Sequence, residues 1–125
     1  MPKMIKTIKT RNLTKSLLDL ILESSSDRLK YELLKKFESE SDILELNKQE
    51  LEKFYSALGE SALKLGNAYN ALVAYEKIQS IEGLKKVKEW YKRNNYSGWV
   101  EYVDGLLRRL KKERKKERNK SKVEA

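Results

Sequence analysis

Apolar residues recur along this chain at intervals of three and four, the spacing that places side chains on one face of an α-helix. The chain carries no strand signal. The pattern therefore predicts an all-α protein with about six helices, paired as three antiparallel hairpins. The predicted helices run from Leu13 to Glu23, from the Asp27 cap to Phe37, from the Asn47 cap to Gly66, from Asn67 to about Ser80, from Gly83 or Leu84 through Tyr91, and from Trp99 to Leu110.

Each predicted helix has one apolar face that we expect to be buried. Asn47 followed by Glu50 is typical of a capping box, in which the two side chains satisfy each other's backbone N–H groups at a helix start. The expected buried residues of the outer hairpins are Leu13, Leu17, Leu20 and Ile21; Leu29, Leu33, Leu34 and Phe37; Leu84, Val87, Trp90 and Tyr91; and Trp99, Val100, Val103, Leu106, Leu107 and Leu110.

The segment from Tyr55 to Ile81 has the most specific pattern in the chain. Its two apolar stripes are Tyr55, Leu58, Gly59, Ala62 and Leu65 on the first helix, and Ala68, Ala71, Leu72, Tyr75 and Ile78 on the second. The small residues leave gaps in which a helix approaches to the short end of the roughly 8–10 Å interaxial range. The two tyrosines fill what remains, so the pattern predicts a closely packed hairpin that turns at Gly66-Asn67.

This hairpin resembles the tetratricopeptide repeat, a helix-turn-helix unit of about 34 residues. The proline expected after its second helix is missing, and Ser80 to Gly83 take its place. The resemblance implies a TPR-like right-handed stack in which the outer hairpins are degenerate units, and an irregular helical bundle is the alternative architecture. The residues that carry the resemblance are Tyr55, Leu58, Gly59, Ala62, Gly66, Ala71, Tyr75 and Ile78.

The same resemblance implies a groove for partner peptides, lined by the first helix of each pair. Family members that grip a peptide's terminal carboxylate use an asparagine where this chain has Glu60, which argues against that clamp. The alternative is a solvated face with a favourable Glu60 to Lys64 pair, worth a few tenths of a kcal/mol. The implied groove residues are Lys53, Ser56, Glu60, Leu63 and Lys64.

Positive charge gathers at the two ends of the chain, whose net charge is +9. It divides the sequence into a basic N-terminal arm (1–12), a helical TPR-like domain (13–110) and a basic C-terminal tail (111–125). The tail has few apolar residues, so we expect a solvated helical extension or a disordered arm. Such a tail is available to a polyanion by counterion release, and the alternative is a solvating role only.

A second basic stretch surrounds Trp90 and Tyr91, with Tyr96 and Trp99 following. Cations interleaved with aromatic residues can hold a single nucleic-acid strand, but these aromatics also fit the core of the last hairpin, which we favour. An exposed Trp99 would favour the binding role. The candidate nucleic-acid contacts are Lys85, Lys86, Lys88, Lys92, Arg93, Arg108, Arg109, Lys111, Lys112, Arg114, Lys115, Lys116 and Arg118.

Cysteine and histidine are both absent, which removes thiol chemistry and the commonest metal ligand and general base. We therefore expect no enzyme, no metal and no cofactor. The longest apolar run, from Leu17 to Leu22, is too short for a membrane span, and we expect a cytoplasmic protein.

These patterns predict a non-enzymatic helical-repeat adaptor that mediates protein-protein interaction and whose basic termini are available to nucleic acid. The alternative is a nucleic-acid-binding protein that uses the Lys85–Arg93 helix and the basic C-terminal tail. A third hypothesis is a homodimer that buries a leftover apolar stripe.

Overall fold

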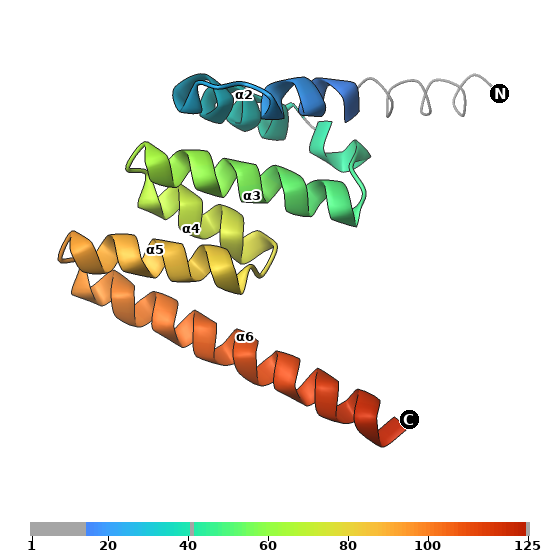
Figure 1. The fold of residues 1–125 in the computed structure, drawn as a ribbon, viewed down its shortest axis with the longest axis vertical. Helices are drawn as coiled ribbons and strands as arrows, with labels where there is room; N and C mark the ends of the chain where they lie inside the picture. Colours follow the sequence, from blue (N-terminus) through green and yellow to red (C-terminus); the bar gives the residue numbers. More distant parts are fainter. Residues whose placement is uncertain (1–14, 41, 125) are drawn as a thin grey trace.

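The computed structural model describes residues 15–40 and 42–124, and Figure 1 shows how they are arranged. This part of the protein is all α-helical, as predicted. A helical segment over 15–22 is followed by α2 (Asp27–Ser39), the short 3-10 helix η1 (Asp42–Glu45), α3 (Lys48–Lys64), α4 (Ala68–Lys77), α5 (Ile81–Arg93) and α6 (Ser97–Glu124). The N-terminal arm and Leu13 lie outside the described residues.

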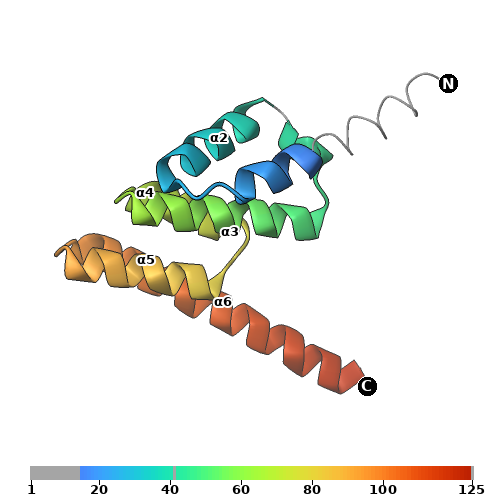
Figure 2. The ribbon, with the colours of Figure 1, turned by 45° about the horizontal axis from the view of Figure 1, so that its top comes forward.

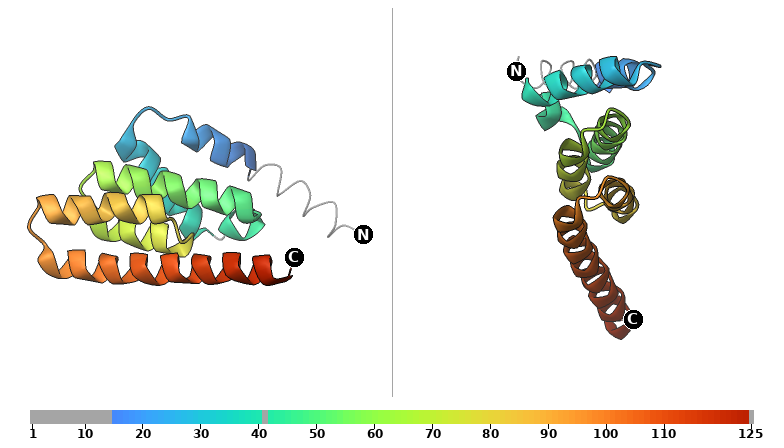
Figure 3. Two further views of the ribbon diagram at one scale, coloured as in Figure 1. Left: turned by 60° about the horizontal axis from the view of Figure 1, so that its bottom comes forward. Right: turned by 90° about the vertical axis from the view of Figure 1, so that its left-hand side faces the viewer.

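The helices form three antiparallel hairpins that follow one another in chain order (Figure 2). Helix α3 packs against α2 and α4, while α5 packs against α4 and α6 and also touches α3. The helix α6 is much longer than its partner α5, and its C-terminal half extends past the other helices (Figure 3). As far as Glu124, the predicted basic tail is therefore the helical extension of α6.

Helix starts follow local capping groups. Asn47 Oδ1 accepts a hydrogen bond from the Glu50 backbone N–H, and Glu50 Oε1 accepts one from the Asn47 N–H, both at 2.9 Å. The predicted capping box is confirmed. Two other predicted helix starts were wrong because a serine before the predicted start caps the helix. Ser26, and not Asp27, caps α2. Ser80 caps α5 by accepting a hydrogen bond from the Gly83 N–H at 3.0 Å.

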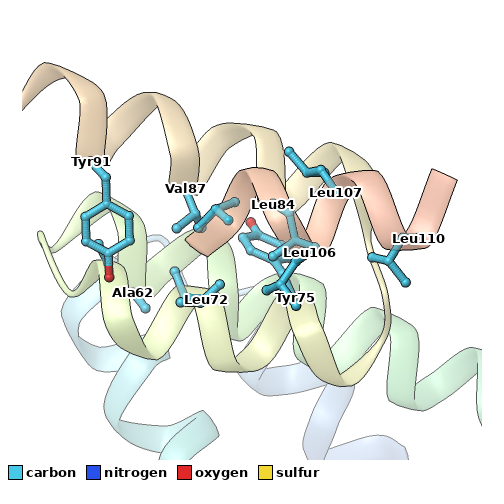
Figure 4. Close-up of a cluster of buried hydrophobic side chains, with 12 residues drawn as sticks. Ala62, Leu72, Tyr75, Leu84, Val87, Tyr91, Leu106, Leu107 and Leu110 are labelled. Carbon is cyan, nitrogen blue, oxygen red and sulfur yellow. The ribbon is translucent and has the colours of Figure 1, made fainter. Parts of the chain in front are cut away.

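Two clusters of buried side chains hold the stack together. The first joins the 15–22 segment, α2, η1 and α3 around Phe54, which is fully buried. The second joins α4 to α5 and α6, where Leu72 and Tyr75 lie against Leu84 and Leu106 (Figure 4). A fully buried leucine or valine contributes roughly 1.5–3 kcal/mol relative to an exposed one, so the second cluster fixes the last hairpin on α4.

Tyr75 lies between two glycines of neighbouring helices. A Cβ atom on Gly59 of α3 would stand 2.6 Å from Tyr75 Cζ, and one on Gly83 of α5 would stand closer still to the same ring. Burial, together with the charge of Glu60, raises the pKa of Tyr75. The ring thus fills the space of two missing side chains, and it joins α3, α4 and α5.

The predicted buried faces were wrong by one residue in several places. Leu17 and Leu20 are exposed while the adjacent Leu18 is buried, because neighbouring apolar residues offer the helix two possible faces. For the same reason Phe54, which the pattern missed, is buried beside Tyr55. Three further residues expected in the core are exposed: Leu29, Leu65 and Trp99. Leu65 follows the last residue of α3, where no neighbouring helix covers it.

Candidate partner-binding surfaces

A groove runs between α4 and α6. Its larger cavity, of about 560 Å³, is lined by Tyr69, Leu72, Val73, Glu76, Gly98, Trp99 and Tyr102. Leu72 is buried and forms the floor, whereas Tyr69 and Tyr102 remain 59% and 48% exposed. The groove therefore presents aromatic and aliphatic surface of α4 and α6 to solvent.

A second cavity, of about 340 Å³, continues the groove toward the C-terminal end of α4. It is lined by Glu76, Gln79, Leu84, Leu106, Arg109, Leu110 and Glu113. Because Glu76 lines both cavities, they adjoin. The groove runs alongside α4, whose 10 residues span roughly 15 Å at 1.5 Å per helical residue.

Aromatic rings close the N-terminal end of the groove. The Tyr69 and Trp99 ring centroids lie 5.8 Å apart across it, and Trp99 stacks on the buried Tyr91 at 5.5 Å. Trp99 itself is 38% exposed, so its predicted place in the core was wrong, whereas that of Tyr91 is confirmed. Trp99 stays open because it sits at the first turn of α6, at the mouth of the groove.

One face of α6 carries glycines that the fold does not need. Gly98, Tyr102 and Gly105 are spaced by four and three residues and so share a face. A Cβ atom on either glycine would meet nothing within 4 Å. Glycine inside a helix costs about 1 kcal/mol relative to alanine, so Gly105 weakens α6 without improving its internal packing.

The face of α3 implied by the repeat resemblance is exposed and charged. Lys53, Ser56 and Glu60 are exposed, and Leu63 packs partly against the core. Lys64 Nζ lies 3.4 Å from Glu60 Oε1 and 3.8 Å from Asp27 Oδ1 of α2. The structure therefore places the five predicted residues on one helix, with one cation already paired to two acids.

The predicted cations of α5 are divided between ion pairs and solvent. Lys88 pairs with Asp104 of α6, and Arg93 pairs with Glu89 at 3.9 Å. The hydrogen bond from Lys88, with the nearby charges of Arg108 and Lys111, lowers the pKa of Asp104. The remaining three predicted cations are exposed: Lys85, Lys86 and Lys92.

The C-terminal half of α6 is the most basic part of the structure. Residues 108–118 contain eight Lys or Arg and two Glu, a net charge of +6. Their side chains are exposed except for Leu110, and Arg114 Nη2 donates to the Gln79 carbonyl at 2.9 Å. Within the described residues, no ion pair involves a cation beyond Arg93. The predicted contacts Arg108, Arg109, Lys111, Lys112, Lys115, Lys116 and Arg118 all lie on this helix.

A polar cluster joins the first two hairpins. Lys77 Nζ of α4 lies 3.3 Å from Glu38 Oε2 of α2 and 5.0 Å from the centre of the Tyr55 ring of α3. Burial opposes ionisation of Glu38, but hydrogen bonding to Tyr55 and Lys77 and the lysine charge lower its pKa. A second polar contact joins the same hairpins, from Asn70 Nδ2 to the Tyr31 hydroxyl at 2.7 Å. These contacts join α4 to α2 and α3.

Across the residues that the structure describes, no group of three or more acidic, histidine or cysteine side chains is placed to hold a metal ion. None of the described helices combines the length and apolar character that a membrane span requires.

Sequence reasoning missed the groove residues Tyr69, Val73 and Tyr102. The signal was present as a second stripe, since Tyr69, Val73 and Glu76 repeat at intervals of four and three beside the buried face of α4. That stripe becomes a surface only because α6 lies next to it, which the spacing within α4 does not reveal.

Comparisons of the chain with protein-family models, with curated proteins and with solved structures return no match.

Proposed function

We propose that the protein is a non-enzymatic helical-repeat adaptor that binds a protein partner, with basic ends that approach nucleic acid or an acidic protein. The groove between α4 and α6 carries this proposal, because it exposes Tyr69, Trp99 and Tyr102 beside aliphatic side chains. Aromatic residues dominate the binding energy of protein interfaces, whereas a chain that serves only as a packed bundle gains nothing from exposing three in one groove.

The repeat resemblance is part of the proposal. Its support is the succession of hairpins in chain order and the close approach at Gly59, where Tyr75 fills the gap left by a missing side chain. In such a stack the face of α3 with Lys53, Ser56 and Glu60 is a second candidate for peptide binding. A cytoplasmic location is also part of the proposal, and a chain without cysteine is compatible with a reducing compartment.

Photo-crosslinking tests the adaptor function. A benzophenone amino acid replaces Tyr102 in the groove or, in a separate chain, Ser56 on α3, and the cells that make the protein are irradiated. We expect conjugates at position 102 that nuclease leaves intact and in which mass spectrometry finds peptides of a second protein. Conjugates that nuclease removes, or none at either position, would contradict the adaptor function.

The exposed cations of α6, together with the exposed Trp99, favour a second candidate function, binding of nucleic acid. Its test is fluorescence anisotropy of labelled single- and double-stranded oligonucleotides across a salt series. The comparison chain carries glutamine at Lys111, Lys112, Lys115 and Lys116, which are exposed. If nucleic acid is the ligand, binding persists at physiological salt and these changes reduce its salt dependence. Binding confined to low salt would leave the groove as the functional surface.

A further inference from the structure

We infer that the groove between α4 and α6 takes an acidic amphipathic helix of a partner protein, with apolar residues at one end and acidic residues at the other. This inference rests on the proposed adaptor function and names the surface and the partner chemistry. It follows from the shape of the groove, from the order of residues along α6 and from the charge of its extension.

The first half of the site is apolar. The floor and walls are Leu72, Val73, Trp99 and Tyr102, and among the described residues Glu76 alone brings a charge to the larger cavity. A groove about 15 Å long holds roughly ten residues of helix, which bring three or four apolar side chains to one face. An amphipathic helix fits both the length of the groove and its apolar lining.

The second half of the site runs from the second cavity, which Arg109 lines together with two glutamates, onto cations on the same face of α6. After Gly98, Tyr102 and Gly105, the same alternation of four and three residues continues through Arg109, Lys112 and Lys116. A helix that follows this seam passes from aromatic and glycine positions onto three successive cations. Charge complementarity therefore places acidic residues at one end of the partner helix.

Nucleic acid fits this groove less well. A phosphate backbone is charged along its whole length, so in the groove it would meet the carboxylates of Glu76 and Glu113. The acidic residues of a partner helix instead lie past these two carboxylates, on the cations that follow Glu113. The cations begin at Arg109, past the apolar part of the groove. Aliphatic and aromatic side chains suit the space between Tyr69 and Leu106.

The two glycines on this face of α6 allow a partner helix to come close. Gly98 and Gly105 flank the exposed Tyr102 and have open space where a Cβ would be. A partner helix can therefore approach the backbone of α6 closely on both sides of that ring, as Gly59 permits inside the fold.

A peptide-display selection on the full chain tests the inference without presupposing a sequence. The probe is a library of random peptides about 20 residues long, selected on the immobilised protein. We expect enriched peptides with apolar residues spaced by three and four, followed by an acidic cluster. We expect Tyr102→Ser to weaken their binding at least tenfold. We expect the double change Lys112→Glu and Lys116→Glu also to weaken binding, by a factor that grows as the salt concentration is lowered. The exposed control Lys48→Glu, at the start of α3 and outside every candidate surface, should leave binding unchanged.

Several results would overturn the inference. Enriched peptides that are basic or uncharged, or whose binding is unaffected by Tyr102→Ser, would place the ligand elsewhere or give it another chemistry. A single-stranded oligonucleotide that displaces the peptides, and whose binding also needs Tyr102, would assign the groove to nucleic acid. Sedimentation equilibrium that shows a dimer lost in Tyr102→Ser would assign it to a second copy. In each case the crosslinking at positions 102 and 56 decides separately whether the adaptor function stands.

Discussion

Tyr75 and Tyr102 are each accompanied by two glycines, but the two arrangements differ in what occupies the space. At Tyr75 the ring covers Gly59 and Gly83 and is buried. At Tyr102 the ring is about half exposed, and nothing lies over Gly98 or Gly105. The first arrangement is completed within the fold. The second leaves surface of the same kind uncovered, which is why we attribute it to a partner.

The largest expected effect comes from removing the inner ring. Tyr75→Ala leaves a cavity between α3, α4 and α5, and we expect it to lower the free energy of unfolding by roughly 3–5 kcal/mol. Urea denaturation followed by circular dichroism measures this change. The matched Tyr102→Ala on the exposed face should cost less than about 1 kcal/mol, and equal costs would erase the contrast between the two tyrosines.

The inner glycines come next. Gly83→Ala puts a methyl group against the Tyr75 ring, and we expect overpacking to cost about 1–3 kcal/mol, with Gly59→Ala acting in the same direction. In a Tyr75→Ala background the added methyl has room, so most of that cost should disappear. A double-mutant cycle in urea measures this coupling, and additive costs would show that the ring and the glycine do not share one space.

The outer glycine should respond with the opposite sign. Gly105→Ala adds a methyl group to open space in the middle of α6, and we expect the free energy of unfolding to rise by up to about 1 kcal/mol, because alanine favours a helix. Thermal and urea denaturation both report the change. A loss of stability would mean that the position already has a neighbour.

The smallest expected effect concerns the ion pair on the polar side of α4, between Lys77 of α4 and Glu38 of α2. This pair joins neighbouring helices on the polar side, as the Tyr75 ring does on the apolar side. The pKa of Glu38 is lowered in the folded state from its ordinary value of 4.5. A lowered carboxyl pKa stabilises the fold above its unfolded pKa, and this contribution is lost as pH falls through the folded pKa.

Because these side chains are partly exposed, we expect Glu38→Gln to remove only a few tenths of a kcal/mol at neutral pH. The difference between the variant and the natural chain should shrink as pH falls below about 4.5. Urea denaturation at several pH values measures it, and a difference independent of pH would show that the carboxylate charge is not responsible.

Local patterns predicted what local chemistry determines. The capping box at Asn47 and the apolar spacing that gives an all-α protein depend on residues three or four apart, and both are confirmed. The choice between Leu17 and Leu18 as the buried residue depends on where α2 and α3 lie, so spacing alone assigned it wrongly.

The roles of single residues in packing were harder to predict. Gly59 was expected to permit a close approach, and it faces Tyr75, but Gly83 was expected only at the start of a helix. The groove depends on α4 and α6, which are separated in the chain by the whole of α5. No periodicity within one helix contains that information, so Tyr69 and Tyr102 were not predicted as site residues.

The most direct test of the account is a paired measurement on Gly105→Leu, with Gly105→Ala as the smaller step. The free energy of unfolding and the affinity for a peptide selected on the natural chain are measured on the same preparations. We predict unchanged or higher stability for both variants, and an affinity that falls slightly with alanine and at least tenfold with leucine. Full affinity in a stable Gly105→Leu protein would contradict the claim that a partner covers this face of α6.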